Sequence, residues 1–319
     1  MKLVEAGGEK TKLPVILVVG PTASGKTEVA IELAKRTGAE IVSADSRQIY
    51  QQLTIGTAKP TEAQLQEVTH HFIDYLPLRE EYSAGQFSRD ARKKIATLQH
   101  QNKSTVVVGG SGMYIDALLN GFFQPIAADK KLQKKLKERA RLEGSDVLHA
   151  ELEKIDPERA AELPPLDAHR IVRSLEIFYA TGEKHSDLLQ TPRIPADFPF
   201  MQFALNWPRS ILYKRIENRV DVMLEQGLLE EVKSLLAHGM AKDNNALLTV
   251  GYREVIQYLD GDLDYKMMVD KIKQHTRNYA KRQVTWFKRD SRIQWIDCAE
   301  KSIDDMVGEI LLHVQDKPE

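Results

Sequence analysis

Short apolar runs and helical patterns alternate along the first part of the chain. Compact apolar runs typical of β-strands occur at residues 13–19, 40–44, 71–75 and 105–108. Apolar residues at helical spacing follow the first run, around Ile31 to Ala34, and recur at residues 83–99 and 112–119. Strands that alternate with helices indicate an α/β fold with a parallel sheet covered by helices on both faces.

A long segment of different character interrupts this alternation. From about Ala127 to Gln190 the sequence is charged and helical in pattern, and it contains no convincing strand. The prolines that bound it are Pro125, Pro192, Pro195 and Pro199. We therefore predict a helical insertion domain at residues 126–197, placed within a core made of residues 1–125 and 198–319.

After the insertion the pattern predicts one more strand, a mostly helical part and a terminal strand. The two strands are expected at residues 200–205 and 293–296, and a helix at residues 210–225. Gly227, Gly239 and Gly261 stand where further helices should stop.

Composition places the chain among ordinary globular proteins. It has 319 residues, of which 42% are hydrophobic, enough for a full core. Its single cysteine, Cys298, excludes an internal disulfide framework and a four-cysteine zinc site, which fits a reducing compartment. The sequence has no apolar run of the length that a signal peptide or a bilayer span needs. We expect a cytoplasmic protein without a membrane segment.

The first motif that carries chemistry is a phosphate-binding loop. Its sequence is Gly20-Pro-Thr-Ala-Ser-Gly25-Lys26-Thr27, with two glycines at fixed spacing before Lys and Thr, between a predicted strand and helix. The glycines let backbone N–H groups surround a phosphate at a helix N-terminus, while Lys26 neutralises charge and Thr27 can hold Mg²⁺. The loop recognises phosphate, for which ATP is only the most common source.

The acidic residue that a hydrolytic ATPase would need is missing from its usual place. The best later strand, 105–108, ends in Gly109-Gly110-Ser111-Gly112 and carries no carboxylate. Asp45 instead closes the run 41–44, at the carboxyl end of a predicted strand, where parallel sheets bind ligands. The alternative for Asp45 is a helix cap or a more distant magnesium ligand.

Basic residues gather in two segments although the net charge is only −1. Residues 130–141 hold seven Lys or Arg and one acid, and residues 266–292 hold nine Lys or Arg and two acids. Such runs are often only solvated helix faces, but they are also what a nucleic-acid surface requires.

An ordered set of motifs resembles the bacterial-type tRNA dimethylallyltransferases, also called tRNA isopentenyltransferases, nearly from end to end. The motifs are the phosphate loop, Ser43-Ala-Asp45-Ser-Arg-Gln48, Ile55-Gly-Thr-Ala-Lys-Pro60, Val108-Gly-Gly-Ser-Gly112, His169-Arg170 with Arg173, Arg215-Ile-Glu-Asn-Arg219, Val250-Gly-Tyr252, and Thr276-Arg-Asn-Tyr-Ala-Lys-Arg-Gln283 followed by Thr285-Trp286. A phosphate loop alone would be weak support for this family, whereas the ordered set is specific.

The resemblance implies a phosphate-loop fold with an inserted helical domain and a transfer of dimethylallyl from its diphosphate to tRNA. The acceptor would be the exocyclic amine of the adenosine on the 3′ side of the anticodon, and the enzyme would be a monomer that uses Mg²⁺. In the family, Asp45 would be the general base, and Thr27 and Arg219 would stabilise the diphosphate. Without the family match, Arg219 would be taken as an exposed helix charge. The loop residues that would hold the diphosphate are Gly20, Thr22, Ala23, Ser24, Gly25, Lys26 and Thr27, with Thr27 also on the metal.

The resemblance also implies a surface for the anticodon stem-loop, with the target base turned out of its stack into a channel. The residues matching the segments that contact tRNA are Asp45, Ser46, Arg47, Gln48, Ser111, His169, Arg170, Arg173, Arg277, Lys281, Arg282 and Gln283, together with residues 247–252. Arg277, Lys281 and Arg282 would contact phosphates of the stem.

Three other functions compete with this interpretation. An adenylate prenyltransferase shares the loop and the donor but uses a free nucleotide, and the long insertion and basic C-terminal helix argue against it. A phosphate-loop small-molecule kinase needs an arginine-rich lid that the sequence does not show. A nucleotide-dependent RNA-binding switch without chemistry would not need Asp45 and Arg219 beside the loop.

Overall fold

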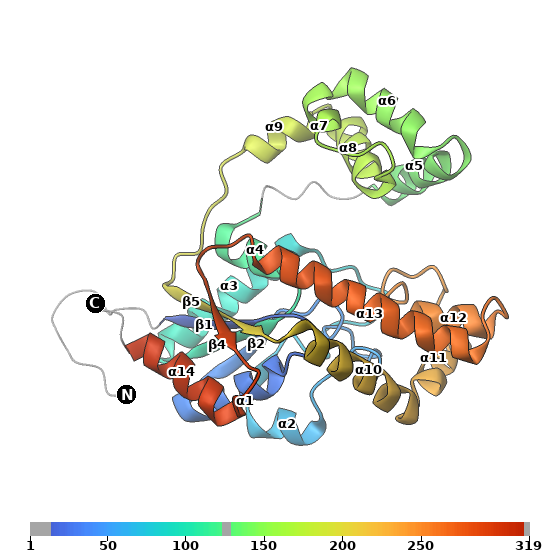
Figure 1. The fold of residues 1–319 in the computed structure, drawn as a ribbon. Helices are drawn as coiled ribbons and strands as arrows, with labels where there is room; N and C mark the ends of the chain where they lie inside the picture. Colours follow the sequence, from blue (N-terminus) through green and yellow to red (C-terminus); the bar gives the residue numbers. More distant parts are fainter. Residues whose placement is uncertain (1–13, 123–128, 316–319) are drawn as a thin grey trace. The chain divides into compact units, whose positions relative to one another are not determined.

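The computed structural model describes residues 14–122 and 129–315, and a parallel β-sheet forms its centre (Figure 1). The strands are β1 (Val15–Val19), β2 (Glu40–Ser43), β3 (His70–His71), β4 (Thr105–Gly109), β5 (Phe200–Asn206) and β6 (Ile293–Asp297). They lie in the order β3-β2-β4-β1-β5-β6, and every neighbouring pair is parallel. The predicted α/β fold is therefore confirmed.

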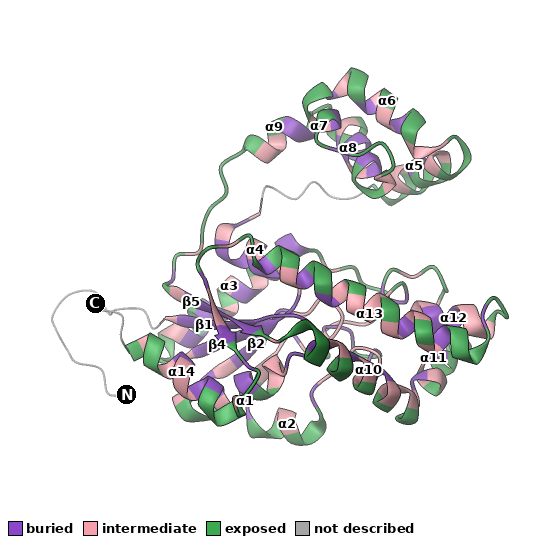
Figure 2. Cartoon of the chain, in the orientation of Figure 1, coloured by how far each residue is buried: buried purple, intermediate pink, exposed green. Residues whose placement is uncertain are grey.

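Helices cover both faces of this sheet (Figure 1). Outside the inserted segment described below, the helices are α1 (Lys26–Thr37), α2 (Glu62–Glu67), α3 (Ala84–His100), α4 (Gly112–Asn120), α10 (Arg209–Glu225), α11 (Leu228–Ala237), α12 (Tyr252–Leu259), α13 (Tyr265–Phe287) and α14 (Ile303–Gln315). Helices α1 and α14 share a buried apolar cluster with one face of the strands, whereas α3 packs on β4 and stacks Phe87 on Tyr114 of α4. Figure 2 shows the strands buried and the outer helix faces exposed.

Complete burial of the central strands explains why their sequences are continuous apolar runs. In β1 and β4, Leu17, Val18, Val106 and Val107 are each 0% exposed. Successive side chains of a strand point to opposite faces, so a strand covered on both sides needs an apolar residue at every position. The sheet therefore fixes the carboxyl ends of β1, β2 and β4 along one edge, where the loops discussed below begin.

One predicted strand is wrong in its extent. The apolar run at residues 71–75 was expected to form a strand, but β3 contains only His70 and His71. The chain leaves the sheet because Phe72 and Asp74 adopt left-handed backbone conformations, with φ of 65° and 51°. Residues in that conformation cannot continue a strand. The chain contacts the sheet region again at the isolated bridge between Tyr50 and Leu76.

The predicted helix boundaries in the C-terminal part are confirmed. Helix α10 spans residues 209–225, and Gly227 precedes α11 with a φ of 99°. Gly239 and Gly261, with φ of 79° and 82°, follow α11 and α12. Left-handed backbone is favourable only for glycine, which is why these three residues mark the helix ends.

A second compact unit, residues 120–195, is inserted between the two parts of the sheet-containing unit, residues 1–119 and 196–319. Its helices are α5 (Lys130–Leu142), α6 (Ser145–Ile155), α7 (Pro157–Ala161), α8 (Ala168–Thr181) and α9 (His185–Gln190). Leu136, Leu148, Leu152 and Leu175 are buried together in its own core. The insertion was expected at residues 126–197, and its expected start falls on residues outside the described part of the chain.

The insertion leaves and re-enters the sheet-containing unit at one place. The N–H of Ala196 donates to the carbonyl of Leu119 at 2.8 Å, which ties the last residue before the unit to the first residue after it. Within the inserted unit, Gly121 has a φ of 83°, and a Cβ on it would overlap the backbone of Ile194. The two connecting segments, around residues 119–121 and 194–196, therefore run side by side.

Candidate active site

The phosphate loop joins β1 to α1 in the strained conformation that such loops require. Gly20 and Gly25 have φ of 145° and 88°, and Ala23 is left-handed at 62° although it has a Cβ. Gly25 caps α1, so the backbone turns at the helix N-terminus, where the helix dipole favours an anion. The geometry predicted from the motif is present.

Two side chains from outside the loop hold its carbonyl groups. The Nε of Arg215 donates to the carbonyl of Ala23 at 2.8 Å, and the indole N–H of Trp207 donates to the carbonyl of Ser24 at 2.8 Å. The guanidinium of Arg215 lies 4.5 Å from the centroid of the Trp207 ring, so the two side chains also stabilise each other. Because the carbonyls point outward, the N–H of Gly25 can face the pocket.

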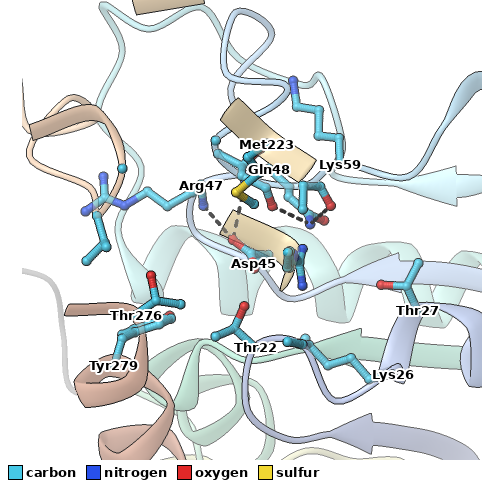
Figure 3. A pocket seen from close by; sticks show the side chains of 18 of the residues that line it. Thr22, Lys26, Thr27, Asp45, Arg47, Gln48, Lys59, Met223, Thr276 and Tyr279 are labelled. Atoms are coloured by element: carbon cyan, nitrogen blue, oxygen red, sulfur yellow. Dashed lines mark hydrogen bonds between the residues drawn. The ribbon is translucent and has the colours of Figure 1, made fainter. Parts of the chain in front are cut away.

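A cavity of about 740 Å³ lies beside the loop, entirely within the sheet-containing unit (Figure 3). Residues from β2, the 56–60 loop, α10, the 248–251 loop and α13 complete it. The predicted site residues that line it are Thr22, Ala23, Gly25, Lys26, Thr27, Asp45, Ser46, Arg47, Gln48, Arg219, Arg282 and Gln283. Gly20 and Ser24 are buried in the loop itself, and Ser111, Arg277 and Lys281 are not among the lining residues.

The cationic side of the cavity is built from Lys26 and Arg219. Burial lowers the pKa of Lys26 to about 8, and the positive charge of Arg219 adds to this effect, while Asp45 and Glu28 oppose it. Burial also lowers the pKa of Arg219, again against the attraction of Glu28 and Asp45. Two cations held close together and partly dehydrated are poised to bind an anion that carries more than one negative charge.

Asp45 lines the same cavity, and its charge acts on both cations. Its Oδ1 accepts hydrogen bonds from the backbone N–H groups of Arg47 at 2.9 Å and Gln48 at 3.3 Å. Asp45 therefore closes a turn and does not cap a helix, because residues 46–49 form only a turn, and it also faces the pocket (Figure 3). The two bonds fix the orientation of the carboxylate, because one oxygen is held by the backbone.

The other residues of the 45–48 segment are held by the protein around them. Ser111 Oγ accepts the N–H of Ser46 at 3.0 Å, and Arg47 donates to the carbonyl of Asn245 at 3.1 Å. Gln48 Nε2 donates to the carbonyls of Thr57 and Ala58. Ser111 thus supports the wall of the pocket from behind.

Small residues let the strands and α13 approach one another at this edge. A Cβ on Gly109 would overlap the backbone of Ala44, one on Gly110 would overlap the Gln283 amide, and one on Gly112 would overlap the Trp286 ring. The double-glycine motif at the end of β4 is therefore explained by close packing between the phosphate loop, the Asp45 turn and α13.

The basic residues of α13 differ in whether their charge is already paired within the protein. Arg277 donates to Glu217 at 2.6 Å, so its charge is already paired within the protein. Lys281 and Arg282 are exposed, and the guanidinium of Arg282 lies 5.8 Å from the centroid of the Tyr279 ring. Burial strongly raises the pKa of Tyr279, so this pocket residue is a neutral phenol.

The predicted RNA contacts of the insertion lie on α8. His169 and Arg170 are exposed in its first turn, where Arg170 pairs with Asp167. Arg173 is half-buried and lies 3.0 Å from the buried carboxylate of Glu176. The structure describes this unit by itself, so the approach of these residues to the cavity stays a prediction.

Sequence reasoning did not assign roles to Trp207 or to Arg215. Arg215 does stand in the motif that ends at Arg219, one helical turn earlier, so a shared helix face was the available signal. For Trp207 no local signal exists, because its partner Ser24 is 183 residues away in the sequence.

Among the residues that the structure describes, no three His, Cys, Asp or Glu side chains come together as a metal site. Within the same residues, no helix combines the length and the apolar character that crossing a membrane requires.

Comparison with known proteins gives one consistent result. The model of the IPP transferase family matches residues 48–290. The tRNA dimethylallyltransferases of Thermotoga petrophila and Chlorobium phaeovibrioides are 42% and 45% identical over 294 and 295 residues, covering 92% and 90% of this chain and 95% and 93% of theirs.

Solved structures agree with the sequence relatives. The tRNA isopentenylpyrophosphate transferase of Bacillus halodurans is 34% identical with a TM-score of 0.71, covering 95% of this chain and 96% of that one. A eukaryotic dimethylallyltransferase described as acting on tRNA is 27% identical with a TM-score of 0.79, covering 96% of this chain and 80% of that one. The chain belongs to the IPP transferase family.

Proposed function

We propose that this protein transfers the dimethylallyl group of dimethylallyl diphosphate to the exocyclic amine of the adenosine on the 3′ side of the anticodon in tRNA. The observation that carries the proposal is a cavity lined by the phosphate loop, by the cations Lys26 and Arg219 and by the carboxylate of Asp45. The relatives' names point to the same reaction. An adenylate prenyltransferase is the remaining competitor, since it would need the same donor site.

The donor's diphosphate would occupy the phosphate loop. Backbone N–H groups at the start of α1 would bind its oxygens, and Lys26 and Arg219 would balance its charge. When the bond from the allylic carbon to the diphosphate oxygen breaks, the electron pair leaves with the diphosphate. Two partly dehydrated cations stabilise that growing charge more strongly than water would.

The acceptor amine would approach from the side of Asp45. As the amine nitrogen bonds to the allylic carbon, its proton passes to the carboxylate, which acts as general base. The Asx turn keeps Asp45 in place during this step, because its Oδ1 bonds stay with the backbone of Arg47 and Gln48. Tyr279 and Thr276 border the space that a flipped adenine would enter (Figure 3).

A Mg²⁺ ion fits this site as a partner of the donor. Thr27 provides one hydroxyl at the first turn of α1, and the diphosphate and water would supply the other oxygens, as Mg²⁺ prefers. Such an ion would neutralise part of the leaving group's charge.

The anticodon stem would bind to the exposed basic residues of α13, chiefly Lys281 and Arg282, next to the cavity. Contacts from His169, Arg170 and Arg173 of the insertion are part of the same proposal. We further propose that the enzyme acts as a monomer in the cytoplasm.

The direct test is a transfer assay with labelled dimethylallyl diphosphate. One reaction contains unmodified tRNA, a second the same tRNA with guanosine at the target position, and a third adenosine monophosphate. Label in the first reaction alone supports the proposal. Label on the free nucleotide would show that the protein is an adenylate prenyltransferase. No label in any reaction would exclude prenyl transfer as its function.

A further inference from the structure

The side chain of Gln283 is enclosed by the protein and uses both ends of its amide. Its Oε1 accepts the N–H of Thr22 at 2.8 Å, and its Nε2 donates to the carbonyl of Gly110 at 2.9 Å. The residue is 6% exposed, so water competes little with these bonds. The protein therefore fixes the orientation of this amide before any RNA arrives.

The bond to Thr22 also orients the neighbouring carbonyl group. In a trans peptide, the N–H of Thr22 and the carbonyl of Pro21 belong to one plane and point in opposite directions. With the N–H held by Gln283, the Pro21 carbonyl faces away from α13, and the Lys26 ammonium donates to it at 3.2 Å. The N–H of Ser24 donates to the same carbonyl at 3.3 Å.

The sequence leaves space for this arrangement. A Cβ on Gly110 would overlap the Gln283 Nε2 and come within 3.2 Å of the Gly20 carbonyl. Glycine at this position thus allows the amide of an α13 residue to reach between β4 and the phosphate loop.

We propose that Gln283 is a positioning residue for Lys26, acting through the Pro21–Thr22 peptide, in place of a contact to RNA. Its role is to hold the ammonium where the diphosphate of the donor binds, so that less freedom is lost on binding. The inference rests on the proposed donor site and adds a residue to it. It also makes α13 a structural support of the donor site.

The first test replaces Gln283 by Met, which has a similar length and cannot make either bond. We expect the affinity for inorganic pyrophosphate, measured by titration calorimetry, to fall about tenfold. The affinity for an anticodon stem-loop RNA should stay within about twofold of the wild type. Gln274→Met, the same change at an exposed position of α13, should alter neither affinity. A variant that binds pyrophosphate normally and loses RNA binding would overturn the inference.

A double-mutant cycle with Lys26 separates positioning from general stability. If Gln283 acts through Lys26, Gln283→Met should change pyrophosphate affinity by less than about twofold in a Lys26→Met background. An effect of the same size in both backgrounds would show that Gln283 supports the fold without positioning Lys26.

A second variant covers the case in which Gln283→Met does not fold. Gly110→Ala should displace the amide by its added methyl group and reproduce the loss of pyrophosphate affinity, while adding little to a Gln283→Ala variant. Equal and additive effects would contradict the coupling. If the wild-type protein did not bind pyrophosphate, the proposed donor site would be wrong. If the wild type and both variants bound pyrophosphate equally well, only the role of Gln283 would be excluded.

Discussion

The Asp45 side chain is held in place by hydrogen bonds from the backbone that follows it. Asp45 uses one carboxylate oxygen to close a turn with Arg47 and Gln48, and the same side chain lines the pocket together with Lys26 and Arg219. As the proposed general base, Asp45 would lose little freedom when the acceptor arrives. Its amide analogue would preserve the turn and remove both the proton acceptor and the negative charge that acts on Lys26 and Arg219.

Replacing Asp45 by Asn should therefore lower the single-turnover transfer rate by at least about a hundredfold, since the general base is lost and the Oδ1 acceptor is kept. RNA affinity should change by no more than a few fold, as measured by filter binding. Asp243→Asn, at an exposed position, serves as the control. A rate close to the wild type would exclude Asp45 as the base.

The lowered pKa of Lys26 gives a second prediction at this scale. With a pKa of about 8, Lys26 is largely neutral in the free protein at higher pH, and a bound diphosphate would raise its pKa again. Pyrophosphate binding should therefore take up a proton above pH of about 8 and weaken as the pH rises further. Calorimetry in two buffers of different ionisation enthalpy measures this uptake, and Lys26→Met should abolish it. Equal heats in both buffers would contradict the prediction.

Lys26 and Asp45 could be predicted from the sequence because each has a known position relative to a predicted strand or helix, whereas Arg219 was expected only because of the family resemblance. The functions of Gln283, Arg215 and Trp207 could not be predicted. Each depends on a hydrogen bond to the phosphate loop from 183 to 261 residues away, and no local pattern records which way these side chains point.

At the scale of the element, α13 combines two tasks on two faces. One face carries Gln283 and packs against the phosphate loop and β4. The other carries Lys281 and Arg282, both exposed and next to the cavity, whereas Arg277 is already paired with Glu217. The charge excess seen in the sequence is thus not evenly available to RNA.

Neutralising Lys281 and Arg282 together, as Lys281→Gln and Arg282→Gln, should weaken binding of the anticodon stem-loop. It should also reduce the slope of log affinity against log salt by about one to two, because fewer counterions are released. Lys35→Gln with Arg36→Gln on α1 changes the net charge equally, and both residues are paired with acids there. An unchanged slope in the α13 variant would place the RNA surface elsewhere.

The ends of helices and strands could be predicted where a glycine or an unbroken apolar run marked them. Glycines with positive φ mark the ends of α11 and α12, and buried strands appear as unbroken apolar runs. The strand predicted at residues 71–75 was wrong because these apolar residues form a turn, in which Phe72 packs against Tyr75 and Phe87. Burial explains hydrophobicity in both cases, and only the backbone conformation distinguishes them.

At the scale of the whole molecule, each of the two units has its own apolar core. The donor cavity belongs wholly to the unit formed by residues 1–119 and 196–319, and the insertion buries its own leucines. The chemistry of the donor site should therefore not depend on the insertion.

Replacing residues 120–195 by a short Gly-Ser linker tests this independence. Because Leu119 and Ala196 are hydrogen-bonded to each other, a few residues can close the gap at small entropic cost. We expect a folded protein whose pyrophosphate affinity stays within a few fold of the wild type, and whose transfer to tRNA is strongly reduced. Circular dichroism, calorimetry and the transfer assay measure these properties. An unfolded product, or loss of pyrophosphate binding, would show that the units are interdependent.

The hydrogen bond between Leu119 and Ala196 also has an evolutionary consequence. A segment that begins and ends at one point can be lengthened, shortened or exchanged without a change in the register of any strand. Selection can then change the insertion while the sheet and its loops stay as they are. Recombination at this junction would give descendants that differ in the inserted helices and share one sheet.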